Sequence, residues 1–242
     1  MLTLLLTRPR AASERFSATL PRSVLSRVTT VNSPLIRIVK TADDIDFGDA
    51  RGLIFSSSNG VAIASALSPS RDLPCFCVGE ATAKAARQAG WQADCVGATS
   101  DALVSALSQN RPETPLLHIR GTHSRGHIVA RLTAQQCPAR AQVVYEQCLV
   151  PLTEQAEQAL AGPGAVIAPL FSPRTARQFA NQPKGQAPLY LAALSKAVAT
   201  PLKTLTCKEL AIAEHPDSAT MAALVERLVN TAIRVEGNGM AQ

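Results

Sequence analysis

The chain has 242 residues, of which 46% are hydrophobic and 17% charged, so it can fill the cores of two domains and is not intrinsically disordered. Its net charge of +6 leaves nucleic acid, a membrane surface or an anionic small molecule as candidate partners. Aromatic residues make up only 4%, and the Lys and Arg residues are dispersed, which disfavours a nucleic-acid platform of stacked aromatics and favours an anionic metabolite.

Short apolar runs alternate along the chain with Ala-rich segments of helical spacing. Strands are predicted, in chain order, at residues 2–6, 53–56, 75–78, 116–119, 165–168 and 189–192. Helices are predicted after these strands at residues 11–20, 59–67, 81–89, 126–134, 174–180 and 196–202, with a last helix at 219–231. This alternation is typical of parallel sheets with helices on both faces, so the predicted fold class is α/β.

A weak internal repeat relates the two halves of the chain. The segments around Arg8 and Arg120 resemble each other at an offset of 112 residues, those around Ser57 and Ser172 at 115, and those that start near Gly79 and Ala193 at 114. A unit of this length is far longer than a solenoid repeat, so we expect two related α/β lobes.

Two extended segments, residues 34–40 and 143–152, bear on the boundary between the lobes. If they pair as a two-stranded antiparallel linker, a lobe of residues 41–142 is inserted into a lobe made of residues 1–33 and 153–242. A single split near residue 113 would instead keep each repeat whole. The repeat alone does not choose between these two divisions.

The loops that follow the predicted strands carry hydroxyls, backbone amides and cations that suit an anion. Helix starts and Gly-containing turns present free N–H groups, and ligands of open α/β sheets bind beyond the carboxyl ends of the strands. We expect the two lobes to meet at an interdomain cleft lined by such loops. The candidate binding residues are Arg8, Ser57, Ser58, Asn59, Thr82, Arg120, Gly121, Ser172 and Arg174. The serines and Asn59 equally suit helix capping.

The six cysteines form no CxxC pairs, which favours small buried residues in a reducing compartment and therefore a cytoplasmic protein. Cys75 and Cys77 are expected on one face of a strand. No apolar stretch approaches the roughly 20 residues of a membrane span. His118, His123 and His127 lack a completing set of ligands, so we expect solvated histidines and no metal site.

The order of several short motifs resembles that of the uroporphyrinogen-III synthase family. Residues 55–61, FSSSNGV, resemble the family's FTSxNGV segment, and residues 78–83, VGEATA, resemble its VGxxTA segment. The start LLLTRPR, the Arg120–Gly121 turn, the VVYE segment at Tyr145 and the late Phe171-Ser172-Pro173 follow in the family's order. The resemblance covers nearly the whole chain.

This resemblance implies two α/β lobes joined by a two-stranded linker, with the second lobe inserted, and a monomeric lyase of haem biosynthesis. The implied substrate is hydroxymethylbilane, a linear tetrapyrrole with eight carboxylates, which would be handed over by hydroxymethylbilane synthase. The enzyme closes the ring with inversion of ring D and uses no cofactor or metal. Tyr145 matches the family tyrosine proposed to assist departure of the substrate hydroxyl, and Ser57, Asn59 and Thr82 match cleft positions.

The second repeat departs from the family pattern. Ala193 stands where the family has Gly, Lys196 where it has Thr, and Phe171 where FTSP has its Thr. Lys196 could replace the lost amide contact by pairing directly with a carboxylate, so it joins the candidate binding residues. The alternatives are a divergent inactive homologue or a non-enzymatic two-lobed protein that binds an anionic metabolite.

Overall fold

The computed structural model describes residues 2–124, 126–182 and 185–239, with side chains through residue 235. The chain divides into two compact units. Unit 1 comprises Met1–Arg37 and Leu149–Gln242, and unit 2 comprises Ile38–Cys148. Unit 2 is therefore a continuous insertion into unit 1, and the predicted two-lobed α/β class is confirmed.

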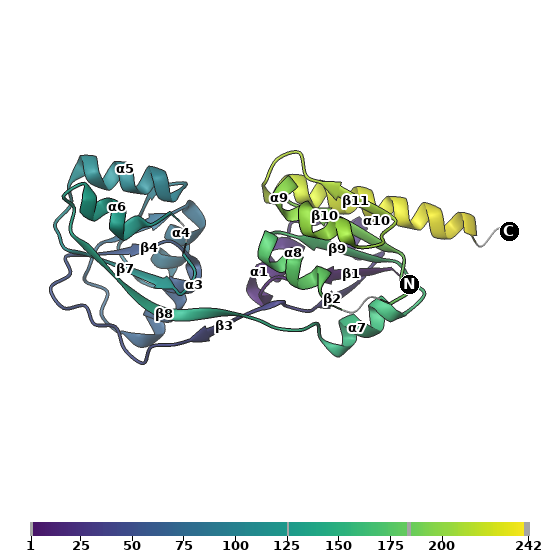
Figure 1. Ribbon diagram of the computed structural model, residues 1–242, viewed down its shortest axis with the longest axis horizontal. Coiled ribbons are helices and arrows are strands. Elements are labelled where there is room, and N and C mark those ends of the chain that lie inside the picture. The colour runs from purple at the N-terminus through teal and green to yellow at the C-terminus, as the bar shows by residue number, and fades with distance from the viewer. Residues whose placement is uncertain (1, 125, 183–184, 240–242) are drawn as a thin grey trace. The chain divides into compact units, whose positions relative to one another are not determined.

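Unit 1 is built on a five-stranded parallel sheet in the order β11-β10-β9-β1-β2. The strands are β1 (Thr3–Leu6), β2 (Thr29–Asn32), β9 (Val166–Leu170), β10 (Leu189–Ala193) and β11 (Glu209–Ile212). The helices are α1 (Arg10–Ser17), α2 (Arg22–Leu25), α7 (Glu154–Ala161), α8 (Pro173–Ala180), α9 (Lys196–Ala199) and α10 (Ser218–Gly239), with a 3₁₀ turn at Thr200–Thr204. Strand β1 lies beside β9, which comes from the segment of unit 1 that follows unit 2 in the chain (Figure 1).

Both faces of the unit 1 sheet are buried. Leu4 and Leu6 of β1 pack into one hydrophobic cluster, which includes α10, whereas Leu5 packs into another beneath α7 and α8. Alternate side chains of a strand point to opposite faces, so the unbroken apolar run of β1 fills two cores at once.

Unit 2 carries a six-stranded sheet in the order β3-β8-β7-β4-β5-β6. Its strands are β3 (Ile36–Lys40), β4 (Gly52–Phe55), β5 (Cys75–Val78), β6 (Ala93–Gly97), β7 (Leu116–Gly121) and β8 (Ala139–Leu149). Its helices are α3 (Ser58–Leu67), α4 (Glu80–Gln88), α5 (Ser100–Asn110) and α6 (Ile128–Ala134). Two clusters again fill the faces, with Leu53 and Phe55 of β4 in one and Ile54 in the other.

Strand β8 runs parallel to β7 from Ala139 to Tyr145, so Tyr145 is a residue of the unit 2 sheet. On its other side β8 adjoins β3, where Thr41 N donates to Val144 O at 3.0 Å and Val150 N to Leu35 O at 3.1 Å. As the residue numbers rise along one segment, those of the bonded partners fall along the other, so this pair is antiparallel. The linker boundaries expected at residues 34–40 and 143–152 stay a prediction.

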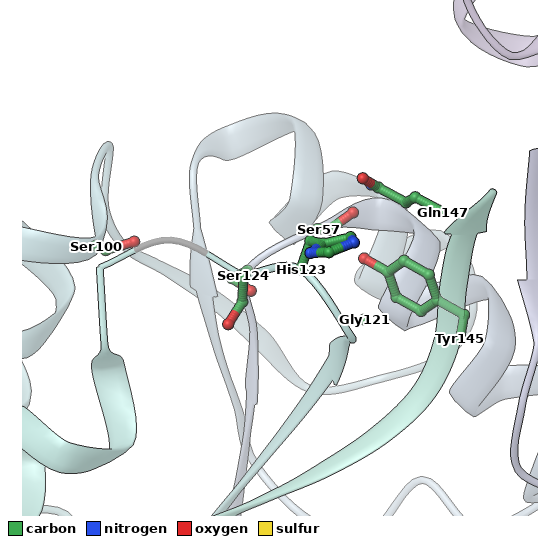
Figure 2. A pocket seen from close by; sticks show the side chains of 8 residues that line it. Ser57, Ser100, Gly121, His123, Ser124, Tyr145 and Gln147 are labelled. Carbon is green, nitrogen blue, oxygen red and sulfur yellow. The ribbon is translucent and has the colours of Figure 1, made fainter. Parts of the chain in front are cut away.

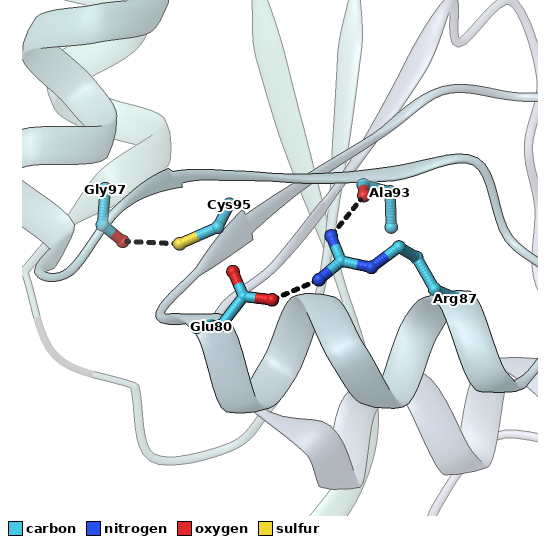
Figure 3. A network of polar contacts seen from close by, with 5 residues as sticks. All are labelled: Glu80, Arg87, Ala93, Cys95 and Gly97. Atoms are coloured by element: carbon cyan, nitrogen blue, oxygen red, sulfur yellow. Dashed lines mark hydrogen bonds and ion pairs between the residues drawn. The ribbon is translucent and has the colours of Figure 1, made fainter.

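The sequence analysis did not predict six of the elements: β2, β6, β11, α2, α5 and α7. Strand β6 is held against α4 by Arg87, whose Nη1 donates to Ala93 O at 2.9 Å while Nη2 pairs with Glu80 (Figure 3). Cys75 and Cys77 are both buried on one face of β5, as predicted.

Among the described helices, none combines the length and the apolar character that crossing a membrane requires.

Candidate functional site

A pocket of about 270 Å³ lies at the carboxyl ends of three neighbouring strands of unit 2. Its walls come from the segments after β4 and β7, from β8, and from the start of α5 (Figure 2). The lining residues are Ser56, Ser57, Ser100, Gly121, His123, Ser124, Tyr145 and Gln147. Hydroxyls, an imidazole, an amide and a phenol thus surround one space, a donor set that suits carboxylate oxygens.

Tyr145 is the most buried polar group of this pocket, with only 3% of its surface exposed. Its backbone carbonyl accepts a hydrogen bond from Thr122 N at 2.9 Å, which ties β8 to the turn after β7. Its hydroxyl has no hydrogen-bond partner among the residues that the structure describes. Figure 2 shows that hydroxyl and the His123 ring directed into the same space, so the phenol is available to a ligand.

Gly121 makes room for the Tyr145 ring. A Cβ at position 121 would overlap three ring carbons of Tyr145. The glycine is required by this close approach, since any side chain there would displace the phenol.

Ser57 begins α3 as its N-cap. Its side chain accepts from Asn59 N at 3.1 Å, and its backbone is extended, as expected of a cap. Ser57 also lines the pocket, so the predicted ligand contact is compatible with its role as a cap. Ser58 and Asn59 start the helix half-buried but do not line this pocket.

Ser56 contacts the adjacent strand. Its Oγ lies 2.8 Å from Nε2 of His118 on β7. His118 is only 2% exposed, and burial, with a smaller contribution from the Arg120 guanidinium, lowers its pKa from 6.5 to about 4. The expectation of a solvated His118 was therefore wrong, because alternation along β7 directs this ring into the interior.

Arg120 lines a neighbouring pocket of about 440 Å³ rather than the tyrosine pocket. Its Nη1 donates to the carbonyls of Gly121 and Thr122, both at 3.1 Å, and to Ser124 Oγ at 3.2 Å. Arg120 thereby fixes the turn that carries Gly121, His123 and Ser124.

Thr82 lies on α4, where only 7% of it is exposed, and its backbone N–H donates to Gly79 O at 3.0 Å. Gly79 has φ +78°, a conformation that favours glycine. Neither residue lines the tyrosine pocket.

The remaining candidates lie in unit 1. Arg8 follows β1, and its guanidinium lies 4.4 Å above the Phe171 ring, where burial, with help from Arg15, lowers its pKa. Ser172 caps α8 by accepting from Thr175 N at 3.1 Å, and Arg174 is half-buried in the first turn of that helix. The structure thus brings Arg8 beside the segment that holds Ser172.

Lys196 is exposed at the first position of α9. Ser195 is the N-cap of α9 as Gly79 is of α4, so the helix starts align Lys196 with Glu80 and the buried Val198 with Thr82. By this alignment Val198, and not Lys196, stands at the position of the family threonine. An apolar side chain therefore replaces the threonine hydroxyl there.

Five lining residues were not among the sequence candidates: Ser56, Ser100, His123, Ser124 and Gln147. His123 and His127 are not on one helix face, because α6 begins only at Ile128 and His127 stands before it with φ +45°. Within the described ranges, no three His, Cys, Asp or Glu side chains are placed to hold a metal ion.

No curated protein matches the chain. Among solved structures, uroporphyrinogen-III synthetase from Helicobacter pylori is similar with a TM-score of 0.67 and 17% identity, covering 94% of this chain and 100% of that one. A mutant uroporphyrinogen III synthase from the extremely thermophilic bacterium Thermus thermophilus is similar with a TM-score of 0.50 and 14% identity, covering 95% and 99%. At these identities the structures show the shared fold. The model of uroporphyrinogen-III synthase HemD matches residues 26–225, so the chain belongs to that family.

Proposed function

We propose that this protein is a uroporphyrinogen-III synthase, which converts hydroxymethylbilane to uroporphyrinogen III and water. The observation that carries the proposal is the Tyr145 hydroxyl, which no described residue hydrogen-bonds, in a pocket of hydroxyl donors of a chain that belongs to this family. The reaction is that of a hydro-lyase that closes a ring, and the substrate contributes the reactive groups.

The Tyr145 phenol would donate a hydrogen bond to the departing hydroxyl of the substrate. Loss of that hydroxyl gives an azafulvene, which the ring-D carbon attacks to form a spiro intermediate before the ring is closed. The protein's main contribution is then to hold the reacting ends together and keep water from the intermediate. Ser57 and Gly121 support this assignment because they line the same pocket.

The other candidate binding residues remain predictions, and each is expected to bind a carboxylate of the substrate. They are Arg8, Ser58, Asn59, Thr82, Arg120, Ser172, Arg174 and Lys196. A monomeric, cytoplasmic enzyme that receives its substrate from hydroxymethylbilane synthase also stays a prediction, as does activity without metal or cofactor.

The test is a coupled assay with freshly made hydroxymethylbilane, with the product isomers separated by chromatography. The type III isomer is expected, and Tyr145→Phe should lower kcat by about 100-fold, in the range of general acid catalysis, with unchanged thermal unfolding. Tyr190→Phe, at the chain's other tyrosine in β10, is the control and should keep kcat.

Formation of the type I isomer alone, the spontaneous product, would refute the proposed function. Tight binding of hydroxymethylbilane without turnover would instead select a non-enzymatic binding protein. An unchanged kcat in Tyr145→Phe would remove Tyr145 from the mechanism and leave the activity assigned.

A further inference from the structure

Ser56 and His118 form a polar pair between two neighbouring strands. Strands β4 and β7 are parallel, with Ile54 beside His118 in register, and Ser56 follows β4 directly. The 2.8 Å contact of Ser56 Oγ with His118 Nε2 joins a ring that is only 2% exposed to a hydroxyl that lines the tyrosine pocket. His118 itself does not line that pocket, so it can reach a ligand there only through Ser56.

The imidazole is neutral near pH 7. Burial and the Arg120 guanidinium both disfavour its protonated form and hold the pKa of His118 at about 4. A neutral imidazole carries its proton on one ring nitrogen. Within the described part of the chain the ring makes no hydrogen bond other than that to Ser56, so no second protein group fixes the tautomer.

The tautomer decides what Ser56 offers to the pocket. If Nε2 is unprotonated, the Ser56 hydroxyl donates to it and presents only lone pairs to a ligand. If Nε2 carries the proton, it donates to Ser56 Oγ, and the Ser56 O–H is free to donate into the pocket. A carboxylate accepts hydrogen bonds only, so it favours the second arrangement.

We propose that His118 is a positioning residue that makes Ser56 a hydrogen-bond donor to a carboxylate in the tyrosine pocket. His118 Nε2–H donates to Ser56 Oγ, and Ser56 O–H donates to the carboxylate. Identification of that carboxylate as an acetate or propionate of hydroxymethylbilane rests on the proposed function. The pair adds no charge to the site, so it contributes to carboxylate binding by hydrogen bonding alone.

The chain offers a cycle of variants for the test. His118→Phe removes the N–H, Ser56→Ala removes the hydroxyl, and His118→Gln retains an amide N–H that can reach Ser56. Each is titrated with uroporphyrin III, an octacarboxylate that does not react, and assayed for kcat and KM with hydroxymethylbilane. Fluorescence of Trp91, the chain's one tryptophan, and thermal unfolding check that unit 2 stays folded.

His118→Phe and Ser56→Ala should each weaken uroporphyrin binding and raise KM by about tenfold, the effect of one hydrogen bond to a charged group, with kcat nearly unchanged. The double variant should bind no more weakly than Ser56→Ala, because His118 acts on the ligand only through the Ser56 hydroxyl. His118→Gln should recover most of the affinity, and nitrogen NMR should find the His118 proton on Nε2 in the uroporphyrin complex.

The proposal is overturned if the effects of the two single variants on affinity multiply in the double variant. A His118 proton on Nδ1 in the uroporphyrin complex would also overturn it. So would wild-type protein that binds no uroporphyrin. The proposed function fails separately: a wild-type protein that makes no type III isomer refutes the activity, while the titrations still decide whether His118 acts through Ser56.

Discussion

Because Gly121 has no side chain, the phenol of Tyr145 can lie against its Cα. The overlap that a Cβ would create is with ring carbons rather than with the tip of a flexible side chain. The ring is also buried, so it has little room to move aside. Gly121 therefore acts on the site through Tyr145.

Gly121→Ala should lower kcat at least tenfold, because a small displacement of the donor costs much of the benefit of positioning. Gly162→Ala is the matched control. Gly162 has φ −75°, and its added Cβ would approach no atom more closely than 3.4 Å. Steady-state kinetics of both variants should separate them, and equal kcat values would show that the Tyr145 ring accommodates the methyl group.

The buried His118 makes stability depend on pH in one direction. Its pKa is about 4 in the folded protein and near 6.5 when unfolded, so the unfolded chain binds the extra proton between these values. Stability from this group is complete above pH 6.5 and is lost as the pH falls toward 4, by on the order of 3 kcal/mol.

Urea unfolding of His118→Gln should therefore lose less stability than wild type between pH 7 and pH 4. Trp91 fluorescence follows the transition, because Trp91 packs in a core of the same unit. Parallel pH curves for the two proteins would mean that His118 titrates normally.

At the scale of elements, the helix starts test whether capping and ligand contact are separate roles. Ser57 caps α3 in unit 2, and Thr153 caps α7 in unit 1 by accepting from Ala156 N at 3.4 Å. Only Ser57 lines the tyrosine pocket.

Ser57→Ala and Thr153→Ala should each cost about 1 kcal/mol of stability, the usual loss of a cap. Ser57→Ala should in addition raise KM several-fold, whereas Thr153→Ala should leave KM unchanged. Thermal unfolding and steady-state kinetics measure the two effects. A normal KM in Ser57→Ala would reduce Ser57 to a cap.

The sequence predicted all the central strands and missed three of the four edge strands. Strands β2, β6 and β11 are edge strands with few buried side chains, such as Val31 alone in β2. Without a buried face they lack the apolar pattern on which the prediction depends. Helix α5 had a usable signal, since Thr99 caps it and Leu103, Val104 and Leu107 are buried at helical spacing.

The site was predictable only in part. Ser57, Gly121 and Tyr145 were found through motifs, and the structure brings them to one pocket. The Ser56–His118 pair needs the fact that β4 lies beside β7, and no local pattern contains the order of strands in a sheet. Gln147 follows Tyr145 by two residues, so alternation along β8 could have indicated it.

On the scale of the whole molecule, each unit holds its own pair of hydrophobic clusters. Unit 2 is one continuous segment, and its first and last strands, β3 and β8, adjoin each other. A domain with its own core and neighbouring ends meets the usual conditions for independent folding.

A fragment of residues 36–149 should therefore unfold cooperatively. Its Trp91 emission should match that of the full chain, since Trp91 packs in a hydrophobic cluster of unit 2. Urea titration followed by fluorescence measures both. A fragment without a cooperative transition would show that unit 2 needs the rest of the chain to fold.

The insertion also sets an order of events during translation. Strand β1 leaves the ribosome before unit 2, yet Thr3 pairs with Val166 of β9, which is made only after all of unit 2. The growing chain must therefore carry an unfinished, strongly apolar sheet while the later domain completes its fold. Such a delay leaves the edge of β1 open to pairing with wrong partners until β9 has been made.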